Sequence, residues 1–319
     1  MEIPAWLRDI ELVTFDCFGT LMDWRRGLQQ VEIESDEDFE AFKQATKRRQ
    51  EQERHQPYSM ILKDSIRELK PHLRNAVVGL FADDFGRVPC FQDAPGNLAA
   101  LKDLVEVGVL SNCDANHQLD VISTLRVAWD VCITSQEIRS YKPSDRAWDA
   151  IVRMGVARTA ATRDGWLHVS AFDKTDLVPA RGRGLKTCFL RRPGGDVKAT
   201  SDLTIDSLSE LVTMLMTAKA GPVVYEVRSK LAEGMNSAEV VGWLTTELMP
   251  QMRGVVGMHD TKLVEPEAGL LVERYTFGGQ RDVEAYLEAY GAEHRSLVRE
   301  RFADQLERTT TTYLVRGRA

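Results

Sequence analysis

A short apolar stretch near the start of the chain ends on a carboxylate, and it constrains the fold more than any other feature. Residues 13–16 read Val-Thr-Phe-Asp, and Gly19 follows three positions later. A run of β-branched and aromatic residues is typical of a strand buried in a parallel sheet. Open α/β sheets bind their ligands at the carboxyl ends of such strands. The stretch therefore predicts a strand that delivers Asp16 to a ligand site.

Strand and helix patterns alternate from residue 97 to residue 216. Short apolar runs predict strands, and the amphipathic stretches between them predict helices. This alternation predicts an α/β fold with a doubly wound parallel sheet. The expected further strands are 105–110, 131–133, 166–170 and 186–190, and the expected helices are 97–104, 115–125, 144–154, 176–183 and 206–216.

Residues 25–88 interrupt this alternation. They carry apolar residues at helical spacing within a charged stretch, and Ser35 followed by three acidic residues is a typical helix start. We expect a small helical bundle, a cap, to be inserted after the first strand. The core domain would then consist of residues 1–24 and 89–218.

The segment 219–222, Lys-Ala-Gly-Pro, ends the alternation and is the expected linker. Residues 223–319 favour the order β-α-β-β-α-β, which is the ferredoxin-like α+β arrangement. They resemble small domains of the dimeric α+β barrel type, in which two four-stranded sheets pack face to face. The resemblance implies a homodimer formed through this domain. The alternative is that the domain supplies a wall or a ligand pocket. The expected strands are 223–227, 255–262, 270–276 and 310–315, and the expected helices are 237–249 and 283–299.

The bulk composition restricts the classes of partner. The 319 residues carry a net charge of −7. This balance does not favour nucleic acid or an anionic membrane, and no apolar run approaches the length of a membrane span. Five cysteines without a Cys-x-x-Cys pair predict reduced thiols. We therefore expect a cytoplasmic protein that acts on a small molecule.

Four landmarks occur in a fixed order along residues 13–190. The first is Phe-Asp-Cys-Phe-Gly-Thr-Leu at 15–21, and it is followed by Ser111-Asn112, by Lys142-Pro143, and by Asp173 with Asp176. The set resembles the motifs of the haloacid dehalogenase (HAD) superfamily of hydrolases, and most closely those of the 2-haloacid dehalogenase branch. The resemblance implies that Asp16 is a nucleophile that forms a covalent aspartyl intermediate. It also implies a catalytic set of Thr20, Ser111, Asn112, Lys142 and Asp176 around that nucleophile.

Two positions distinguish the reactions of this superfamily. HAD phosphatases have a general-acid aspartate two residues after the nucleophile, where this chain has Phe18. They also bind Mg²⁺ through an acidic pair, and Ala171 stands where the first carboxylate of that pair is expected. Displacement of a halide needs neither a proton on the leaving group nor a metal. The chain therefore favours dehalogenase-type chemistry on a small organic acid, without a cofactor.

The resemblance also gives candidates for substrate binding. The run 49–52, Arg-Gln-Glu-Gln, matches the context of the arginine that holds the halide, so Arg49 is expected to contact the leaving group. Trp148 stands where a tyrosine would contact the substrate, and Asp173 stands near an expected asparagine. Phe18 and Cys17 lie next to the nucleophile in sequence.

Two alternatives stay open from the sequence. The first is a phosphate or phosphonate hydrolase that uses Mg²⁺ at Asp16 and Asp176, with Asp173 assisting. The second is a non-catalytic ligand-binding or regulatory protein on a HAD scaffold, whose pocket would be blocked by Phe18 or Trp148.

Overall fold

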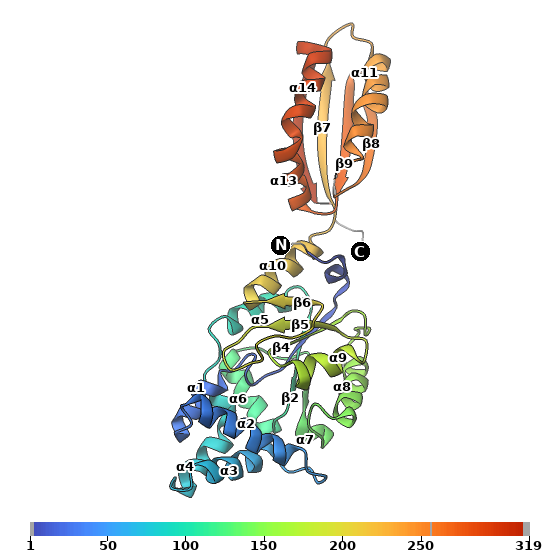
Figure 1. The fold of residues 1–319 in the computed structure, drawn as a ribbon. Helices are drawn as coiled ribbons and strands as arrows, with labels where there is room; N and C mark the ends of the chain where they lie inside the picture. Colours follow the sequence, from blue (N-terminus) through green and yellow to red (C-terminus); the bar gives the residue numbers. More distant parts are fainter. Residues whose placement is uncertain (1–2, 256, 315–319) are drawn as a thin grey trace. The chain divides into compact units, whose positions relative to one another are not determined.

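The computed structural model describes residues 3–255 and 257–314. The chain divides between Leu215 and Met216 into two compact units, within the helix that precedes the expected linker. The first unit is an α/β domain, and the second contains a separate antiparallel sheet, as predicted (Figure 1). Val256 and Val315, which belong to two of the expected strands, lie outside the described residues.

The first unit is built on a six-stranded parallel sheet with the order β3-β2-β1-β4-β5-β6. β1 lies between β2 and β4, so the chain winds outward from it in both directions, and a ligand site is expected at the carboxyl end of β1. The strands predicted from sequence are present, and the short edge strand β6 is additional. The strands are β1 (Leu12–Phe15), β2 (Glu106–Ser111), β3 (Val131–Thr134), β4 (Trp166–Ser170), β5 (Lys186–Leu190) and β6 (Leu203–Ile205).

Most of the helices predicted around this sheet are present with shifts of a few residues at their ends. The exception follows β4, where the helix expected at 176–183 is replaced by a π-helical turn, η4 (Asp173–Leu177), and a short helix, α9 (Val178–Arg181). The wider turn changes the direction in which residues 173–176 point relative to a regular helix. The other helices of the sheet layers are α5 (Ala94–Lys102), α6 (Ala115–Leu125), α7 (Ser135–Ile138), α8 (Asp145–Arg158) and α10 (Leu208–Lys219).

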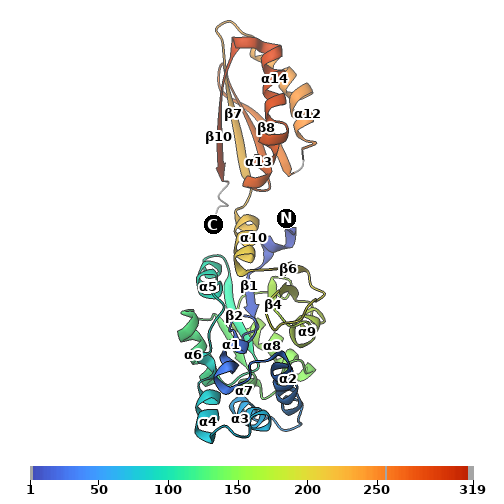
Figure 2. The same ribbon diagram turned by 60° about the vertical axis from the view of Figure 1, so that its left-hand side comes forward.

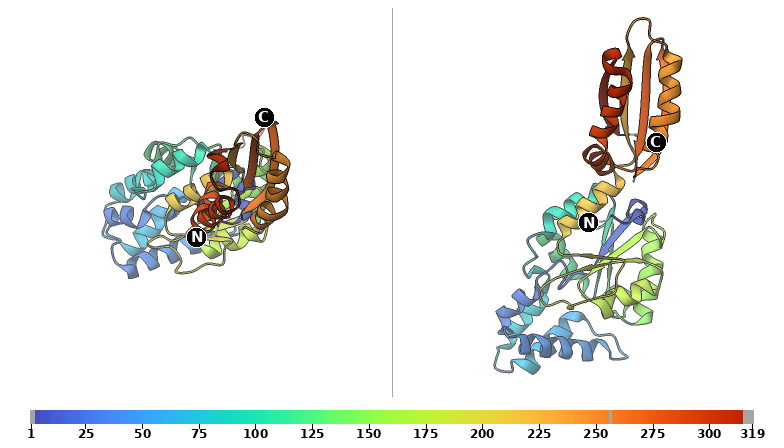
Figure 3. Two further views of the ribbon diagram at one scale, coloured as in Figure 1. Left: turned by 90° about the horizontal axis from the view of Figure 1, so that it is seen from above. Right: turned by 45° about the horizontal axis from the view of Figure 1, so that its top comes forward.

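The helices of residues 25–88 lie together, apart from the strands (Figures 1 and 3). Ser35 begins α2 as predicted, because its hydroxyl accepts a 3.0 Å hydrogen bond from the Asp38 N–H. α3 packs against both α2 and α4. The helices are α1 (Trp24–Leu28), α2 (Asp36–Gln50), α3 (Tyr58–Leu69) and α4 (Asn75–Asp83), and the 3-10 turns of this unit are η1 (Ala5–Asp9), η2 (Gln29–Val31) and η3 (Phe85–Arg87).

The second unit has the predicted β-α-β-β-α-β order and an antiparallel sheet with the order β10-β7-β9-β8. Its helices cover one face of the sheet (Figure 2). The helix expected at 283–299 is two helices that meet at Tyr290. The elements are β7 (Val223–Leu231), α11 (Ser237–Trp243), η5 (Leu244–Leu248), α12 (Met249–Met252), β8 (Met258–Glu267), β9 (Leu270–Phe277), α13 (Gln280–Ala289), α14 (Gly291–Phe302), η6 (Ala303–Gln305) and β10 (Leu306–Leu314).

No helix in the described part of the chain is both long enough and apolar enough to cross a membrane.

Candidate active site

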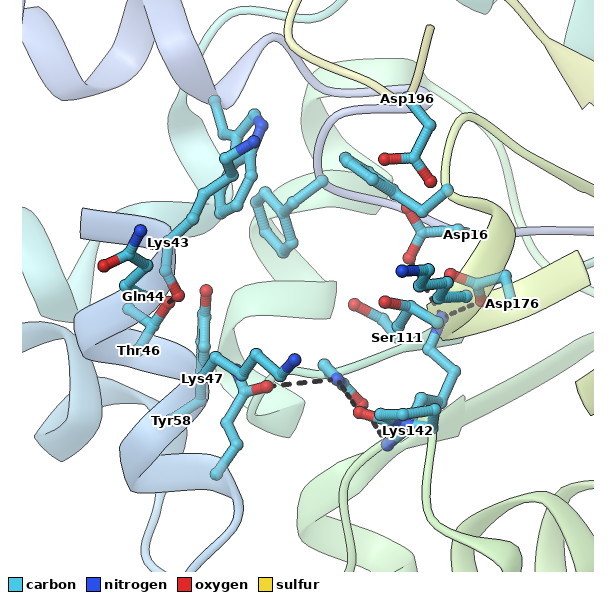
Figure 4. Close-up of a pocket in the computed structure, with 18 of the residues that line it drawn as sticks. Asp16, Lys43, Gln44, Thr46, Lys47, Tyr58, Ser111, Lys142, Asp176 and Asp196 are labelled. Atoms are coloured by element: carbon cyan, nitrogen blue, oxygen red, sulfur yellow. Dashed lines mark hydrogen bonds and ion pairs between the residues drawn. The ribbon is translucent and has the colours of Figure 1, made fainter. Parts of the chain in front are cut away.

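The ends of β1 and β4 bring three buried charged groups together (Figure 4). Asp16 follows β1, Asp176 lies in the π-helical turn after β4, and Lys142 lies just before α8. The Lys142 ammonium is 3.0 Å from Asp16 Oδ1 and 2.6 Å from Asp176 Oδ1. All three side chains are almost fully removed from solvent. Sequence reasoning predicted these residues, and the fold places them at one point.

All three N–H donors of the Lys142 ammonium are used within the protein. Besides the two carboxylates, the ammonium donates to the Leu110 carbonyl oxygen at 2.8 Å. A lysine ammonium has three donors and no acceptor. Lys142 can therefore hold and neutralise the carboxylates, but in this arrangement it has no donor left for a substrate.

The two carboxylates differ in pKa. For Asp16, burial raises the pKa and the nearby Asp176 charge adds to the rise, and the Lys142 ammonium offsets this only in part. For Asp176, burial also acts to raise the pKa, but Lys142 and His168 outweigh it and the pKa is lowered. The two carboxylates together raise the pKa of Lys142 against the effect of its burial. Asp176 therefore keeps its charge to lower pH than Asp16 does.

Hydrogen bonds hold the Asp16 carboxylate and the turn that follows it. The Thr20 hydroxyl donates to Asp16 Oδ2 at 2.9 Å and accepts from the Ala171 N–H at 3.1 Å. Gly19, which lies between Asp16 and Thr20 in the sequence, has φ +93°. A Cβ at this position would lie 2.6 Å from the Phe172 ring. The turn therefore needs glycine at this position. Each oxygen of Asp16 consequently has a donor, Thr20 on one side and Lys142 on the other.

Ser111 and Asn112, at the end of β2, have different roles. The Asn112 side chain accepts from the Lys142 N–H at 2.8 Å and donates to the Lys142 carbonyl at 2.9 Å, so it fixes the backbone that carries the lysine. The Ser111 hydroxyl is buried and has no hydrogen-bond partner among the described residues. Ser111 is one of the residues that line the cavity, together with Asp16.

A cavity of about 380 Å³ opens in front of Asp16. On one side it is bounded by the strand ends, and on the other by α2 of the helical insertion, as Figure 4 shows. Sequence reasoning did not identify this α2 wall. Its signal was present, because polar residues recur three or four positions apart on one helix face. The α2 residues that line the cavity are Glu40, Lys43, Gln44, Thr46, Lys47 and Gln50.

Two further polar atoms beside the cavity lack a partner within the described residues. They are the indole N–H of Trp24 and Oδ2 of Asp176, and both residues line the cavity. Buried polar groups are normally satisfied by protein, water or a ligand. Together with the Ser111 hydroxyl they are three buried polar atoms without a partner within the described residues, on residues that line the cavity.

The predicted substrate-binding residues divide into two groups. Phe18 lines the cavity, whereas Cys17, Arg49, Trp148 and Asp173 are not among the residues that line it. The Arg49 guanidinium is bound by the Ala45 carbonyl at 3.0 Å and by Glu68 at 2.8 Å. The expectation that Arg49 reaches the leaving group is therefore not met in this structure.

The other three residues are not part of the cavity lining, although two of them contact residues that line it. The Trp148 indole donates to the Thr175 carbonyl at 3.1 Å, which supports the π-helical turn. The Asp173 N–H donates to Asp196 at 2.7 Å. Cys17 is fully buried, and burial raises the pKa of its thiol well above the usual range. The non-catalytic alternative expects Phe18 or Trp148 to block the pocket. Neither side chain closes the cavity.

The magnesium alternative, with Asp16 and Asp176 as ligands and Asp173 assisting, stays a prediction. Mg²⁺ prefers an octahedral shell of oxygen ligands. Among residues 3–255 and 257–314 no group of three acidic, His or Cys side chains is placed to hold a metal ion. The Lys142 ammonium occupies the position between Asp16 and Asp176, and Asp173 lies outside the cavity lining.

Solved structures of L-2-haloacid dehalogenases are similar to this chain. One has 26% identity and a TM-score of 0.55, with 65% of this chain and 99% of that chain covered. A defluorinating L-2-haloacid dehalogenase has 21% identity and a TM-score of 0.54, with 67% and 98% covered. The Xanthobacter autotrophicus L-2-haloacid dehalogenase with chloropropionic acid covalently bound has 15% identity and a TM-score of 0.54, with 65% and 98% covered.

The first unit has the fold of a HAD-type hydrolase. These neighbours support the predicted class, a HAD-like hydrolase, and they match about two thirds of the chain. No protein-family model matches the sequence, and a search of the curated proteins found no match. The role of each HAD-type site residue remains a prediction.

Replacing Lys142 with methionine should destabilise the protein strongly. The change leaves Asp16 and Asp176 buried without their shared counter-charge, which costs about 3–5 kcal/mol when one member of a buried pair is removed. Urea unfolding followed by circular dichroism at neutral pH measures the change. The matched control is Lys102→Met, because Lys102 pairs with Asp130 near the surface and such pairs contribute about 1 kcal/mol or less. Equal effects of the two substitutions would contradict this account of Lys142.

Proposed function

We propose that this chain hydrolyses a carbon–halogen bond next to the carboxylate of a small organic acid, with Asp16 as the nucleophile. One observation carries the proposal: Asp16 faces a cavity with both of its oxygens held by donors, and Phe18 stands where a general acid would be needed for other leaving groups. A halide leaves without a proton, so an apolar side chain at this position does not impede the reaction.

In the first half-reaction one Asp16 oxygen attacks C2 of the acid. The new C–O bond forms as the C–halogen bond breaks, and the halide leaves with the electron pair. A carboxylate that is buried and held in place attacks more readily than one in water, because it has no hydration shell to lose and its orientation is fixed. The product of this step is an ester of Asp16. Whichever oxygen becomes the carbonyl of the ester retains a donor, either Lys142 or Thr20.

In the second half-reaction water hydrolyses the ester. Asp176 is the proposed general base, because it lines the cavity next to Asp16 and its Oδ2 atom has no partner within the described residues. The water oxygen attacks the carbonyl carbon of Asp16, and the resulting oxyanion is stabilised by the donor retained there. Cleavage of the ester releases a 2-hydroxy acid and restores Asp16.

The carboxylate of the substrate needs donors other than Lys142. Ser111 and Trp24 line the cavity and carry buried donors that have no partner within the described residues. Lys43, which pairs with Glu40, and Lys47, which pairs with Glu51, add ammonium donors on the α2 wall. We assign the recognition of the acid to these groups, in place of Arg49. No cofactor enters this scheme.

The proposal has support from one structural neighbour. The Xanthobacter autotrophicus L-2-haloacid dehalogenase was solved with chloropropionic acid covalently bound. A covalent adduct of a short 2-haloacid is the kind of intermediate that the arrangement around Asp16 would form.

We also propose a cytoplasmic location and a homodimer. All five cysteines are free, as a reducing compartment would keep them. The second unit has one sheet face without a helix over it, and such a face can pack against its counterpart in another copy.

The wild-type protein should release halide from one or both enantiomers of 2-chloropropionate without added metal. Asp16→Asn should release none above background, because an amide lacks the anionic nucleophile. Halide detection by ion chromatography measures both. The matched control is Asp173→Asn, which lies outside the cavity lining and should keep most of the activity. Absence of release by the wild type on both enantiomers would refute the proposal.

The rate of halide release should fall as the pH is lowered, and the midpoint of this fall should lie above the ordinary aspartate pKa of 3.8. The attack needs ionised Asp16, and burial raises the pKa of this carboxyl, so activity is present above that pKa and is lost as the pH falls through it. The dependence of kcat/KM for halide release on pH measures the midpoint. A 2-chloro acid stays ionised over this range, so the substrate contributes no titration of its own. A flat profile down to pH values below the ordinary aspartate pKa would contradict the assignment.

A further inference from the structure

A buried chain of hydrogen bonds runs behind the cavity from β4 to Asp176. The Trp166 indole N–H donates to Thr14 Oγ1 at 2.7 Å, and Thr14 Oγ1 lies 3.0 Å from His168 Nδ1. On the other side of the ring, His168 Nε2 lies 3.2 Å from Asp176 Oδ1. The four side chains are fully buried. Trp166, Thr14 and His168 do not line the cavity, and the proposed reaction has given them no role.

The partners of His168 determine which of its nitrogens carries the proton. Asp176 keeps its charge, so Nε2 must carry a hydrogen and donate it to the carboxylate. Thr14 accepts the indole N–H, since an indole nitrogen only donates, and its own hydroxyl hydrogen can then turn towards Nδ1. A neutral imidazole with the hydrogen on Nε2 satisfies every contact in the chain. The chain therefore fixes the ring orientation and keeps a hydrogen on Nε2.

His168 and Lys142 donate to the same oxygen of Asp176. Both contacts are to Oδ1, at 3.2 Å and 2.6 Å, whereas Oδ2 is buried and has no partner among the described residues. A carboxylate held by Lys142 alone could rotate and present either oxygen to the ammonium. The second donor, which comes from another direction, fixes the rotation and leaves Oδ2 free as an acceptor.

We propose that His168 is a positioning residue that acts only in the second half-reaction. This rests on the proposed function. With Oδ1 held, Asp176 Oδ2 takes a proton from water as the water oxygen bonds to the carbonyl carbon of the Asp16 ester. The bond between that carbon and the ester oxygen then breaks, and the departing alkoxide takes the proton back from Asp176. The step consumes one water, and the second proton of that water leaves the regenerated Asp16 carboxyl for solvent, so that Asp16 and Asp176 are both ionised again.

The first half-reaction does not need His168. The ring contacts neither Asp16 nor the cavity, and the Lys142 and Thr20 donors to Asp16 do not depend on it. Loss of the imidazole should therefore leave halide displacement nearly unchanged and slow hydrolysis of the ester. A residue with a purely structural role would instead affect both steps, or neither.

His168→Leu tests this split. Mixed rapidly with a 2-haloacid that the wild type turns over, the variant should release about one halide per site at the wild-type rate and then turn over about 10- to 100-fold more slowly. The expected slowing is smaller than the full rate enhancement that a general base usually contributes. Mass spectrometry of the quenched protein should show the substrate ester on the Asp16 peptide, at a higher level than in the wild type.

Two further variants guard against a folding defect. His168→Gln retains an N–H near the position of Nε2 and should restore turnover to within a few-fold of the wild type. Thr14→Val removes the group that holds Nδ1 but leaves the imidazole, and it should show the same split with a smaller factor. Circular dichroism and the unfolding midpoint confirm that each variant is folded.

The outcomes separate the two proposals. Three results would each overturn the role of His168: equal slowing of the burst and of steady turnover in His168→Leu, no accumulated ester, or failure of folded His168→Gln to restore turnover. The proposed function would still stand in these cases, provided that the wild type turns over the substrate. If His168→Leu does not fold, the Thr14→Val measurement decides in the same way. No halide release by the wild type on any 2-haloacid tested would overturn the proposed function and, with it, this inference.

Discussion

The site depends on one buried ammonium that is shared by two carboxylates. Removing an ion from water costs several kcal/mol even after the protein relaxes, and two carboxylates close together add their mutual repulsion. Lys142 offsets both costs through contacts of 3.0 Å and 2.6 Å, and its third donor goes to the backbone of β2. The parallel sheet makes this arrangement possible, because Asp16 and Asp176 leave from adjacent strands and Lys142 is fixed to the end of β2 through Asn112.

The same arrangement gives the two carboxylates different surroundings, which match the different roles proposed for them. Asp16 has a donor on each oxygen and a raised pKa, which suits a nucleophile whose charge is lost when it forms an ester. Asp176 has two donors on one oxygen and, within the described residues, none on the other, and its pKa is lowered. Two titratable groups with environments that shift their pKa values apart are a common basis for division of labour in catalysis. In the proposed reaction Asp16 therefore attacks the substrate in the first step, whereas Asp176, positioned by His168, activates water in the second.

The sequence predicted most of the part of the site that the sheet supplies. Asp16, Ser111 and Asp176 follow strands, and the carboxyl ends of neighbouring parallel strands meet at one edge, so their proximity follows from the topology. The α2 wall was not predicted, because the face that a cap helix turns towards the sheet depends on packing between distant segments. Arg49 illustrates this: it lies on the same helix as Lys43 and Lys47, but its side chain turns to Glu68 on α3. The sequence predicted His168 only as part of the strand at 166–170. Its neighbour Thr14 lies on β1, so this contact depends on the pairing of β1 with β4.

The most direct test of the central claim, attack by Asp16 on carbon, is a single turnover in water enriched in the heavy isotope of oxygen. With enzyme in excess over a 2-haloacid, the hydroxyl oxygen of the product should come from Asp16 and be light, and the peptide that carries Asp16 should gain one heavy oxygen. Heavy oxygen in the product of the first turnover, with an unlabelled Asp16, would show that water attacks the substrate directly. It would contradict the covalent role assigned to this carboxylate.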